Sequence, residues 1–245
     1  MPSNPLKLKI AYLLPDLLES FCDEANVKAF LWRANLRGID VQIYNVLEHE
    51  KIQSTKYDFY YIGGSNSENL EKALLSLKTN KDELHIASSA GIPMLAVNCG
   101  YQLFGNFYQL HNKTRLEGLK LLDVDSIASK KPFFGPVTGI YNFLKNKTIA
   151  GFENHSIKTY LRPSAAPFLT IKKGFGNNAE DKTEGARNNN VIGTYLTSAL
   201  LPQNPHFCDF LIAVALRIKY KCKVPLTPLC DDIEWYSHNY IVENS

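Results

Sequence analysis

The stretch PMLAVNCGYQLFG, residues 93–105, carries the clearest information about the fold. Residues 92–97 are continuously apolar, which is typical of a strand buried on both faces of a parallel sheet. A tight turn at residues 98–100 follows, and the next residues fit a helix over 101–108. A strand, a sharp turn and a helix place the turn at the carboxyl edge of an open α/β sheet, where such folds bind ligands. The stretch therefore predicts a site at this turn.

The chain before this stretch alternates strand and helix patterns. Apolar runs predict strands at residues 8–14, 39–46 and 57–64, and helical periodicity predicts helices at 26–36 and 67–77. Strands that are joined by helices run parallel and are covered by those helices. We therefore expect an α/β fold with a mostly parallel open sheet flanked by helices, similar to flavodoxin.

The pattern changes after residue 116, where strands joined by turns replace the alternation. Residues 172–190 are rich in Gly, Asn and charged residues, and they predict a long loop or hairpin. Asp181, Glu184 and Arg187 in this segment are expected either to contact a partner or to be solvated. A strand at 191–196 and an amphipathic helix at 205–219 are expected to follow.

No linker interrupts these patterns, so we expect a single domain over residues 1–245. Residues 224–245 are expected to form a C-terminal extension that carries Trp235, Tyr236 and Tyr240. This extension either packs on the domain or docks a partner.

Composition excludes several classes of protein. The net charge of +3 over 245 residues argues against a chain that binds nucleic acid through its charge. No apolar run approaches the roughly 20 residues that a membrane span needs. The five cysteines are widely spaced and odd in number, which predicts reduced thiols of a cytoplasmic protein. No phosphate-binding loop or paired-histidine motif occurs, so we expect no cofactor and no metal.

The turn after residue 97 has the architecture of a nucleophile elbow. Such an elbow holds its nucleophile in a strained conformation, and small neighbours such as Gly allow the turn to close. Backbone N–H groups at the start of the next helix stabilise an oxyanion, and the turn at residues 62–64 could supply another donor. The chemistry also needs a thiolate and a base. Cys99 is the first candidate for the thiolate.

Several longer motifs point to one family. They are GFENHSIKTYL, KGFGNNAEDKTEGAR, VIGTYL and LLPQNPHFCDFLI, at residues 151–161, 173–187, 191–196 and 200–212. Together with GYQLFG they resemble the class I glutamine amidotransferases of the cobyric-acid-synthase (CobB/CobQ) type, and within these the glutaminase (GatD) subunits of lipid II isoglutaminyl synthase. The resemblance runs from residue 8 to about residue 216.

The resemblance implies a class I glutamine amidotransferase fold and a cytoplasmic subunit that hydrolyses glutamine. Such a subunit passes ammonia to a Mur-ligase-like (MurT-type) partner, which amidates the D-glutamate of the peptidoglycan precursor. The family uses a cysteine as nucleophile, a histidine as base and an arginine that holds the glutamine.

These three reactive positions are substituted here. Aligning GYQL on residues 100–103 places the nucleophile position of the family's CGGYQL at Asn98, and Cys99 falls on its first glycine. Thr197 stands at the position where the family has the histidine that follows GTYL. Pro132 stands at the position where the family has the arginine of its RLIGN run.

Other positions of the site are kept in part. Gln102 stands in the GYQL helix start, where the family places it. The family's GGGQD turn retains Gly63 and Gly64 but continues differently at residues 65–67. The opening motif YGDxGN is replaced over residues 21–26.

Each substitution removes a chemical function. An asparagine amide is not a nucleophile, a threonine hydroxyl does not accept a proton at neutral pH as imidazole does, and proline carries no charge. We therefore predict a glutaminase-inactive homologue with a binding or regulatory role. The loss of the arginine argues against glutamine binding. A one-residue slip at an elbow is expected to turn the Cys99 side chain away from the pocket.

The alternative is an active glutaminase that uses the displaced Cys99 with a non-standard base. His155 and His206 are the candidate bases. His155 lies in the ENHS motif, so a structural role is expected for it. His206 is expected to be an exposed residue at a helix start.

Overall fold

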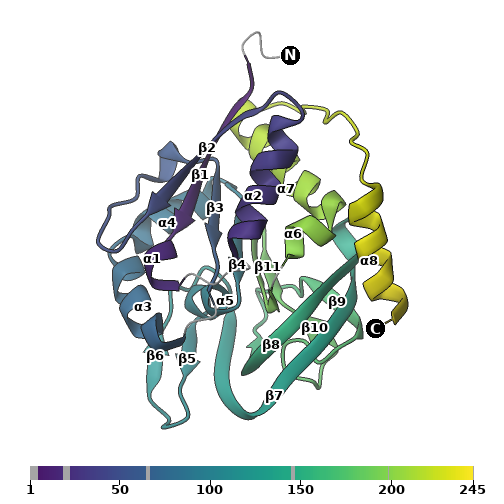
Figure 1. Ribbon diagram of the computed structural model, residues 1–245. Helices are drawn as coiled ribbons and strands as arrows, with labels where there is room; N and C mark the ends of the chain where they lie inside the picture. Colours follow the sequence, from purple (N-terminus) through teal and green to yellow (C-terminus); the bar gives the residue numbers. More distant parts are fainter. Residues whose placement is uncertain (1–4, 19–22, 65–66, 145–146, 198, 245) are drawn as a thin grey trace.

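The computed structural model describes residues 5–18, 23–64, 67–144, 147–197 and 199–244. Within them the chain forms two β-sheets (Figure 1). One sheet is mostly parallel and is covered by helices, and the other is built around a long hairpin. No helix among the described residues is long and apolar enough to cross a membrane.

The first sheet has six strands in the order β11-β12-β4-β3-β1-β2. The parallel strands are β1 (Lys7–Leu13), β2 (Asp40–Val46), β3 (Phe59–Ile62), β4 (Met94–Val97) and β12 (Val191–Thr194), and β11 (Ala186–Asn188) pairs antiparallel at one edge. Because side chains alternate along a strand, Tyr60 and Ile62 of β3 enter one core and Phe59 and Tyr61 enter the other. The predicted α/β class with a mostly parallel open sheet is confirmed.

Helices cover both faces of this sheet (Figure 1). One core contains residues of α1 (Pro15–Leu18), α3 (Leu70–Lys78), α4 (Lys81–Ser89) and α5 (Cys99–Phe104). The other contains residues of α2 (Asp23–Asn35), α6 (Leu200–Gln203) and α7 (Pro205–Tyr220). The elbow thus follows a strand, β4, whose two faces are packed in two different hydrophobic cores. Single 3-10 turns lie at Ser54–Lys56, Ser67–Asn69 and Asn142–Leu144.

The second sheet follows the elbow helix in the chain. Its long strands β7 (Val124–Tyr141) and β8 (Lys147–Leu161) pair antiparallel, with an irregular register between Ala128 and Phe133. The short strands of this sheet are β5 (Phe107–Gln109), β6 (Arg115–Glu117), β9 (Leu169–Lys173), β10 (Thr183–Glu184) and β13 (Leu196–Thr197). Through β8 and β13 this sheet reaches the carboxyl edge of the first sheet, where the elbow lies.

Some predicted boundaries are wrong. The helix expected over 101–108 begins at Cys99 and ends at Phe104, because Gly105 adopts an extended conformation and the chain continues into β5. The predicted helix at 26–36 already begins at Asp23. Helix α4 lies in a stretch for which the sequence predicts neither helix nor strand.

The C-terminal extension packs on the domain through a helix, α8 (Asp232–Asn244). His238 is buried, and its Nε2 lies 2.8 Å from Thr148 Oγ1 on β8. The Trp235 ring stacks on His206 of α7 with 5.0 Å between ring centroids. His206 is therefore covered by the extension and is not the exposed residue that the sequence predicts.

Candidate active site

Asn98 occupies the tip of the turn between β4 and α5. Its backbone angles are φ 52° and ψ −110°, a positive-φ conformation that is strained for a residue with a side chain. The Asn98 N–H donates to the Thr194 carbonyl at 2.8 Å, and the Asn98 carbonyl accepts from Gln102 N–H at 3.3 Å. The strained position of this elbow is therefore residue 98, the residue placed there by the GYQL register.

Glycine is required beside this tip because the neighbouring backbone is very close. A Cβ atom on Gly100 would lie 2.7 Å from the Ile62 carbonyl oxygen. Gly64 has φ +119°, and a Cβ there would lie 2.6 Å from the Leu18 carbonyl oxygen. Gly63 is buried at the same turn, directly after β3. These contacts hold the elbow against the end of β3.

The backbone N–H of Cys99 is already engaged. It donates to the Gly64 carbonyl oxygen at 3.0 Å. In an elbow, the N–H that follows the nucleophile is the expected donor to an oxyanion. Because a carbonyl oxygen accepts that hydrogen bond here, this donor is not available to a reacting substrate in this conformation.

A cavity of about 490 Å³ opens beside the elbow. Its lining comes from α5, from β5 and the turn after it, and from the middle of β8: Asn98, Cys99, Gln102, Tyr108, Leu110, His111, Asn154, His155, Ser156 and Ile157. Three of these side chains are carboxamides, which can both donate and accept hydrogen bonds. Cys99 is among the lining residues, and it is also a buried member of the core that contains α5.

His155 is the buried imidazole of this cavity. Its side chain is 1% exposed, and its ring stacks on Tyr195 with 3.9 Å between centroids. The Ile157 N–H donates to His155 Nδ1 at 3.4 Å, and Nε2 lies 3.7 Å from Glu153 Oε2. No hydrogen-bond partner of Nε2 is found among the described residues. The ring is thus held by stacking, with one nitrogen free of a close partner.

Cys99 and His155 both line the cavity, and Tyr195 lies near each of them. The Tyr195 ring lies against His155, and its hydroxyl bonds to Thr159 Oγ1 at 2.6 Å. Burial raises the pKa of Tyr195, and the nearby Cys99 thiol adds to that effect. A tyrosine that stays protonated cannot serve as the base for Cys99 at neutral pH.

The other two substituted positions lie apart from this cavity. Thr197 is in β13, and its hydroxyl donates to the Phe152 carbonyl at 3.3 Å. Pro132 is exposed in the irregular part of β7, one residue before Phe133, whose ring contacts His155 edge-on. Neither side chain is among the described residues that line the cavity. Residues 65–66 and 21–22, which belong to the altered motifs, lie outside the described residues.

Two buried carboxylates support the region around the elbow. Glu184 accepts hydrogen bonds from the Thr194 hydroxyl at 2.9 Å and from Tyr195 N–H at 2.7 Å. Burial raises the pKa of Glu184 to about 8. Glu153 accepts from the N–H groups of Phe175 and Gly176, at 2.6 and 2.8 Å. The sequence predicts that Glu184 is either solvated or in contact with a partner. That prediction is wrong, because Glu184 is buried within the fold.

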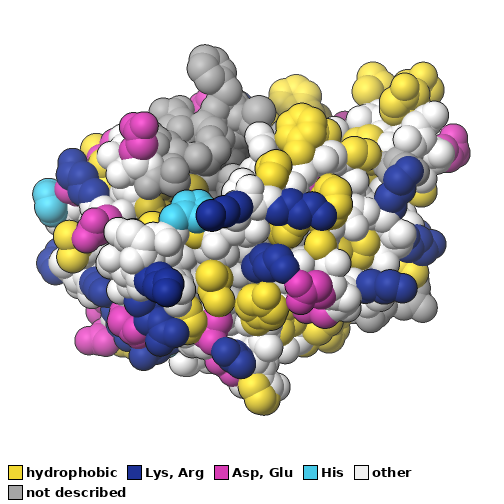
Figure 2. Space-filling model, turned by 90° about the horizontal axis from the view of Figure 1, so that it is seen from below, with side chains coloured by type: hydrophobic (Ala, Val, Ile, Leu, Met, Phe, Trp, Pro, Cys, Tyr) yellow, Lys and Arg dark blue, Asp and Glu magenta, His cyan; other side chains and the backbone are white. Residues whose placement is uncertain are grey.

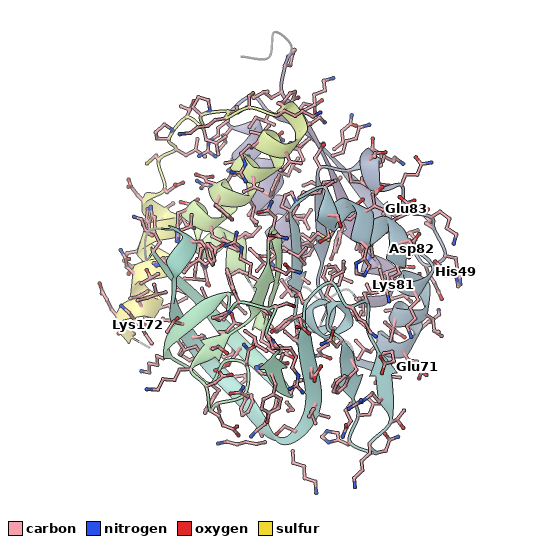
Figure 3. The ribbon with its side chains drawn as sticks, turned by 180° about the vertical axis from the view of Figure 1, so that it is seen from behind. His49, Glu71, Lys81, Asp82, Glu83 and Lys172 are labelled. Carbon is pink, nitrogen blue, oxygen red and sulfur yellow. The ribbon has the colours of Figure 1, made fainter. Side chains whose placement is uncertain are left out.

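Other titratable residues lie on outer surfaces. Figure 3 labels His49, Glu71, Lys81, Asp82 and Glu83 on one side of the molecule and Lys172 on the opposite side. None of them lines the cavity. Across the part of the chain that the structure describes, no group of three or more His, Cys, Asp and Glu side chains could hold a metal ion. The cavity lining therefore offers one thiol, two imidazoles and several hydrogen-bonding groups.

Comparison with known proteins gives consistent results. The model of the CobB/CobQ-like glutamine amidotransferase domain matches residues 9–205. Subunit GatD of the glutamine-hydrolysing lipid II isoglutaminyl synthase of Staphylococcus aureus strain N315 is 33% identical over 213 residues, which are 87% of this chain and 86% of the relative. The corresponding subunit of Streptococcus pneumoniae is 29% identical and covers 94% of this chain and 88% of its own length.

Solved structures agree on the fold. A chain of PurLQS from Thermotoga maritima superposes with a TM-score of 0.57 at 14% identity, covering 89% of this chain and all of that one. A glutamine amidotransferase from the same organism gives a TM-score of 0.54 at 12% identity, covering 96% of this chain and 93% of that one. At these identities the likeness concerns the fold alone.

Proposed function

This chain belongs to the CobB/CobQ-like glutamine amidotransferase family, and we propose from that premise that it is the amidotransferase-fold subunit of a lipid II isoglutaminyl synthase. In this role it binds a ligase subunit of the Mur-ligase (MurT) type. It does not hydrolyse glutamine itself. Its contribution is to bind or regulate the ligase.

The observation that carries the proposal is the residue at the elbow tip. Asn98 holds the strained backbone conformation that a nucleophile needs, and it is one of the residues that line the cavity. The nitrogen of a carboxamide is not basic and cannot form an acyl intermediate with glutamine. The architecture of acyl transfer is present without the group that performs it.

The surroundings of Asn98 support the same reading. The Cys99 N–H is bonded to the Gly64 carbonyl, which occupies an oxyanion donor. Thr197 uses its hydroxyl to bond the Phe152 carbonyl. Pro132 supplies no positive charge for the substrate carboxylate. Nucleophile, base and substrate clamp are therefore all absent from the positions where the family has them.

The nitrogen source of the complex tests this proposal. The chain would be reconstituted with its ligase subunit, and amidation of lipid II would be followed with ammonium chloride or with glutamine. We expect amidation with ammonium and none above background with glutamine. Equal amidation from both sources would overturn the loss of hydrolysis. Absence of any complex with the ligase subunit would overturn the subunit role.

A second candidate function is favoured by one observation, the place of Cys99 on the cavity wall with His155. In this alternative Cys99 is an active nucleophile with a non-standard base. A thiol-reactive glutamine analogue should then label Cys99 and be blocked by glutamine. The Asn98→Cys variant is the matched positive control, because its new thiol stands at the elbow tip. Labelling at position 98 of the variant without labelling of Cys99 in the wild type would exclude the alternative.

A further inference from the structure

Exposed apolar side chains collect on one surface of the molecule. They come from α2 and the residue after it, from the edge strand β2 and the residue after it, and from α8: Trp32, Leu36, Ile43, Leu47, Ile233, Tyr236 and Tyr240. Helix α6 contacts both α2 and α8, and Figure 1 shows α2 and α8 on the same side of the molecule. We call this the α2–α8 surface. Exposed apolar side chains that gather in number on a surface mark interaction sites.

Helix α8 is apolar on two opposite faces. Its inner face presents Trp235 and the buried His238 to the domain. Ile233, Tyr236 and Tyr240 are spaced i, i+3 and i+7, so they form one stripe on the outer face. The exposed fractions of these three side chains are 82%, 75% and 60%. A helix that is apolar on both faces is typical of one that is covered on both sides.

A buried ion-pair network fixes α8 to the domain. Arg33 of α2 donates to Asp209 of α7 at 2.7 Å and to Asp231, directly before α8, at 2.6 Å. Arg37 donates to Asp209 at 2.7 Å and to the Thr227 carbonyl in the preceding segment at 2.7 Å. Both arginine side chains are at most 5% exposed. The outer stripe is therefore held in a defined position before any partner binds, which lowers the entropic cost of binding.

Two grooves flank α2 on this surface. A groove of about 570 Å³ lies between α2 and α8, and Ala29, Trp32, Pro202 and Glu234 are among its lining residues. A second groove of about 380 Å³ lies between α2 and the edge strand, and Ile43 and Leu47 contribute to it. Grooves between helices are suited to an amphipathic helix of a partner protein.

The charge around these grooves is acidic. Helix α8 contains Asp232, Glu234 and Glu243 and no Lys or Arg. The second groove includes Asp16 and Glu24. Lys28 lies in both grooves, but its Nζ is paired with Glu24 at 2.9 Å. Lys28 and Glu24 thus offset each other, and Asp16, Asp232, Glu234 and Glu243 are the carboxylates that remain on this surface.

We propose that the α2–α8 surface docks the ligase subunit, through a helix whose apolar residues are flanked by Lys and Arg. The inference rests on the proposed function, because that function supplies the partner. The acidic rim selects this occupant over two others. A symmetric contact between two copies of this chain would bring carboxylates against carboxylates, and an anionic membrane would be repelled.

The opposite end of the molecule provides the internal control. Lys130, Lys131 and Phe134 lie on β7, and Figure 2 shows Lys and Arg side chains spread over this end. Phe134 is 64% exposed, the same fraction as Trp32. Phe134 on the basic end and Trp32 on the α2–α8 surface are thus equally exposed.

The test measures the affinity of the full-length chain for the co-expressed ligase subunit. We expect Trp32→Glu and Tyr236→Glu each to weaken binding by about tenfold or more, as for anchors at the centre of an interface. The matched Phe134→Glu variant should bind like the wild type. Glu234→Lys should weaken binding most at low salt, because it reverses a charge on the rim. Circular dichroism of each variant checks that it is folded.

The outcomes separate the inference from the proposed function. If the wild type binds the ligase subunit and Trp32→Glu and Tyr236→Glu bind equally well, the surface assignment is overturned and the subunit role stands. If the wild type does not bind the ligase subunit, both are overturned. If sedimentation of the wild type alone shows a dimer that Trp32→Glu dissociates, the occupant is a second copy and the inference is overturned.

Discussion

The elbow at the end of β4 and the buried carboxylates beside it are neighbours with opposite properties. At the elbow, the strained backbone is present and the reactive groups are not, since Asn98 stands at the tip. Glu153 and Glu184, which are far from the elbow in the chain, each accept at least two hydrogen bonds from the protein. The difference teaches that the polar groups which build this fold are separable from those which perform chemistry on it.

The largest expected effect concerns the pH dependence of stability through Glu184. Burial raises its folded pKa to about 8 from 4.5, so between these values the folded state binds more protons than the unfolded state. The contribution of Glu184 to stability is therefore full below pH 4.5, falls as pH rises and is flat above pH 8. The loss amounts to about 5 kcal/mol across this window.

Urea unfolding at pH 5 and pH 8 measures this effect. The Glu184→Gln variant keeps both hydrogen bonds but cannot ionise, so its stability should fall less over the same interval than that of the wild type. Parallel pH profiles for the two proteins would contradict the buried, protonated carboxyl.

The next effect concerns Glu153. Replacing it in Glu153→Ala leaves the N–H groups of Phe175 and of the buried Gly176 without these acceptors, which costs about 3 kcal/mol. Denaturant unfolding measures the loss. Glu153→Gln retains a carbonyl acceptor and should lose clearly less. If the two variants were equally stable, the hydrogen bonds to Glu153 would not be what supports this region.

A smaller effect is expected at the elbow for Gly100→Ala. The added Cβ would lie 2.7 Å from the Ile62 carbonyl oxygen, so α5 or β3 must shift at a cost of about 2 kcal/mol. The unfolding free energy of the variant measures this cost. A variant as stable as the wild type would show that the elbow is not packed against β3 as described.

The smallest effect has the opposite sign. Asn98 holds φ 52° and ψ −110°, a conformation that glycine adopts without strain, so Asn98→Gly should stabilise the protein by about 1 kcal/mol. Thermal and urea unfolding report the gain. Destabilisation would mean that the Asn98 side chain itself contributes to the fold, and the elbow would then not be only a retained backbone shape.

Much of the fold follows from local pattern, because apolar periodicity and turn residues are local properties. The stretch around Asn98 predicts the buried strand, the turn and the helix, and the GYQL register places residue 98 at the tip. The end of α5 at Phe104 was missed because Tyr108 continues the apolar pattern into β5. That boundary depends on pairing with β7, which a local pattern does not contain.

The site was less predictable than the fold, for the same reason. Glu184 lies in a stretch rich in Gly, Asn and charge, and its burial follows from contacts with β12 across the sheet edge. Cys99 shares its cavity with residues 154–157 of β8, which lie far from it in the chain. Such placements depend on residues far apart in the chain, and only the folded arrangement brings them together.

Glutamate release from glutamine tests the central claim most directly. The wild type and the Cys99→Ala variant would be assayed in parallel at saturating glutamine, each in complex with the ligase subunit. The account predicts that both release glutamate at the rate of a buffer control. Turnover by the wild type that Cys99→Ala abolishes would contradict it and would make Cys99 the nucleophile.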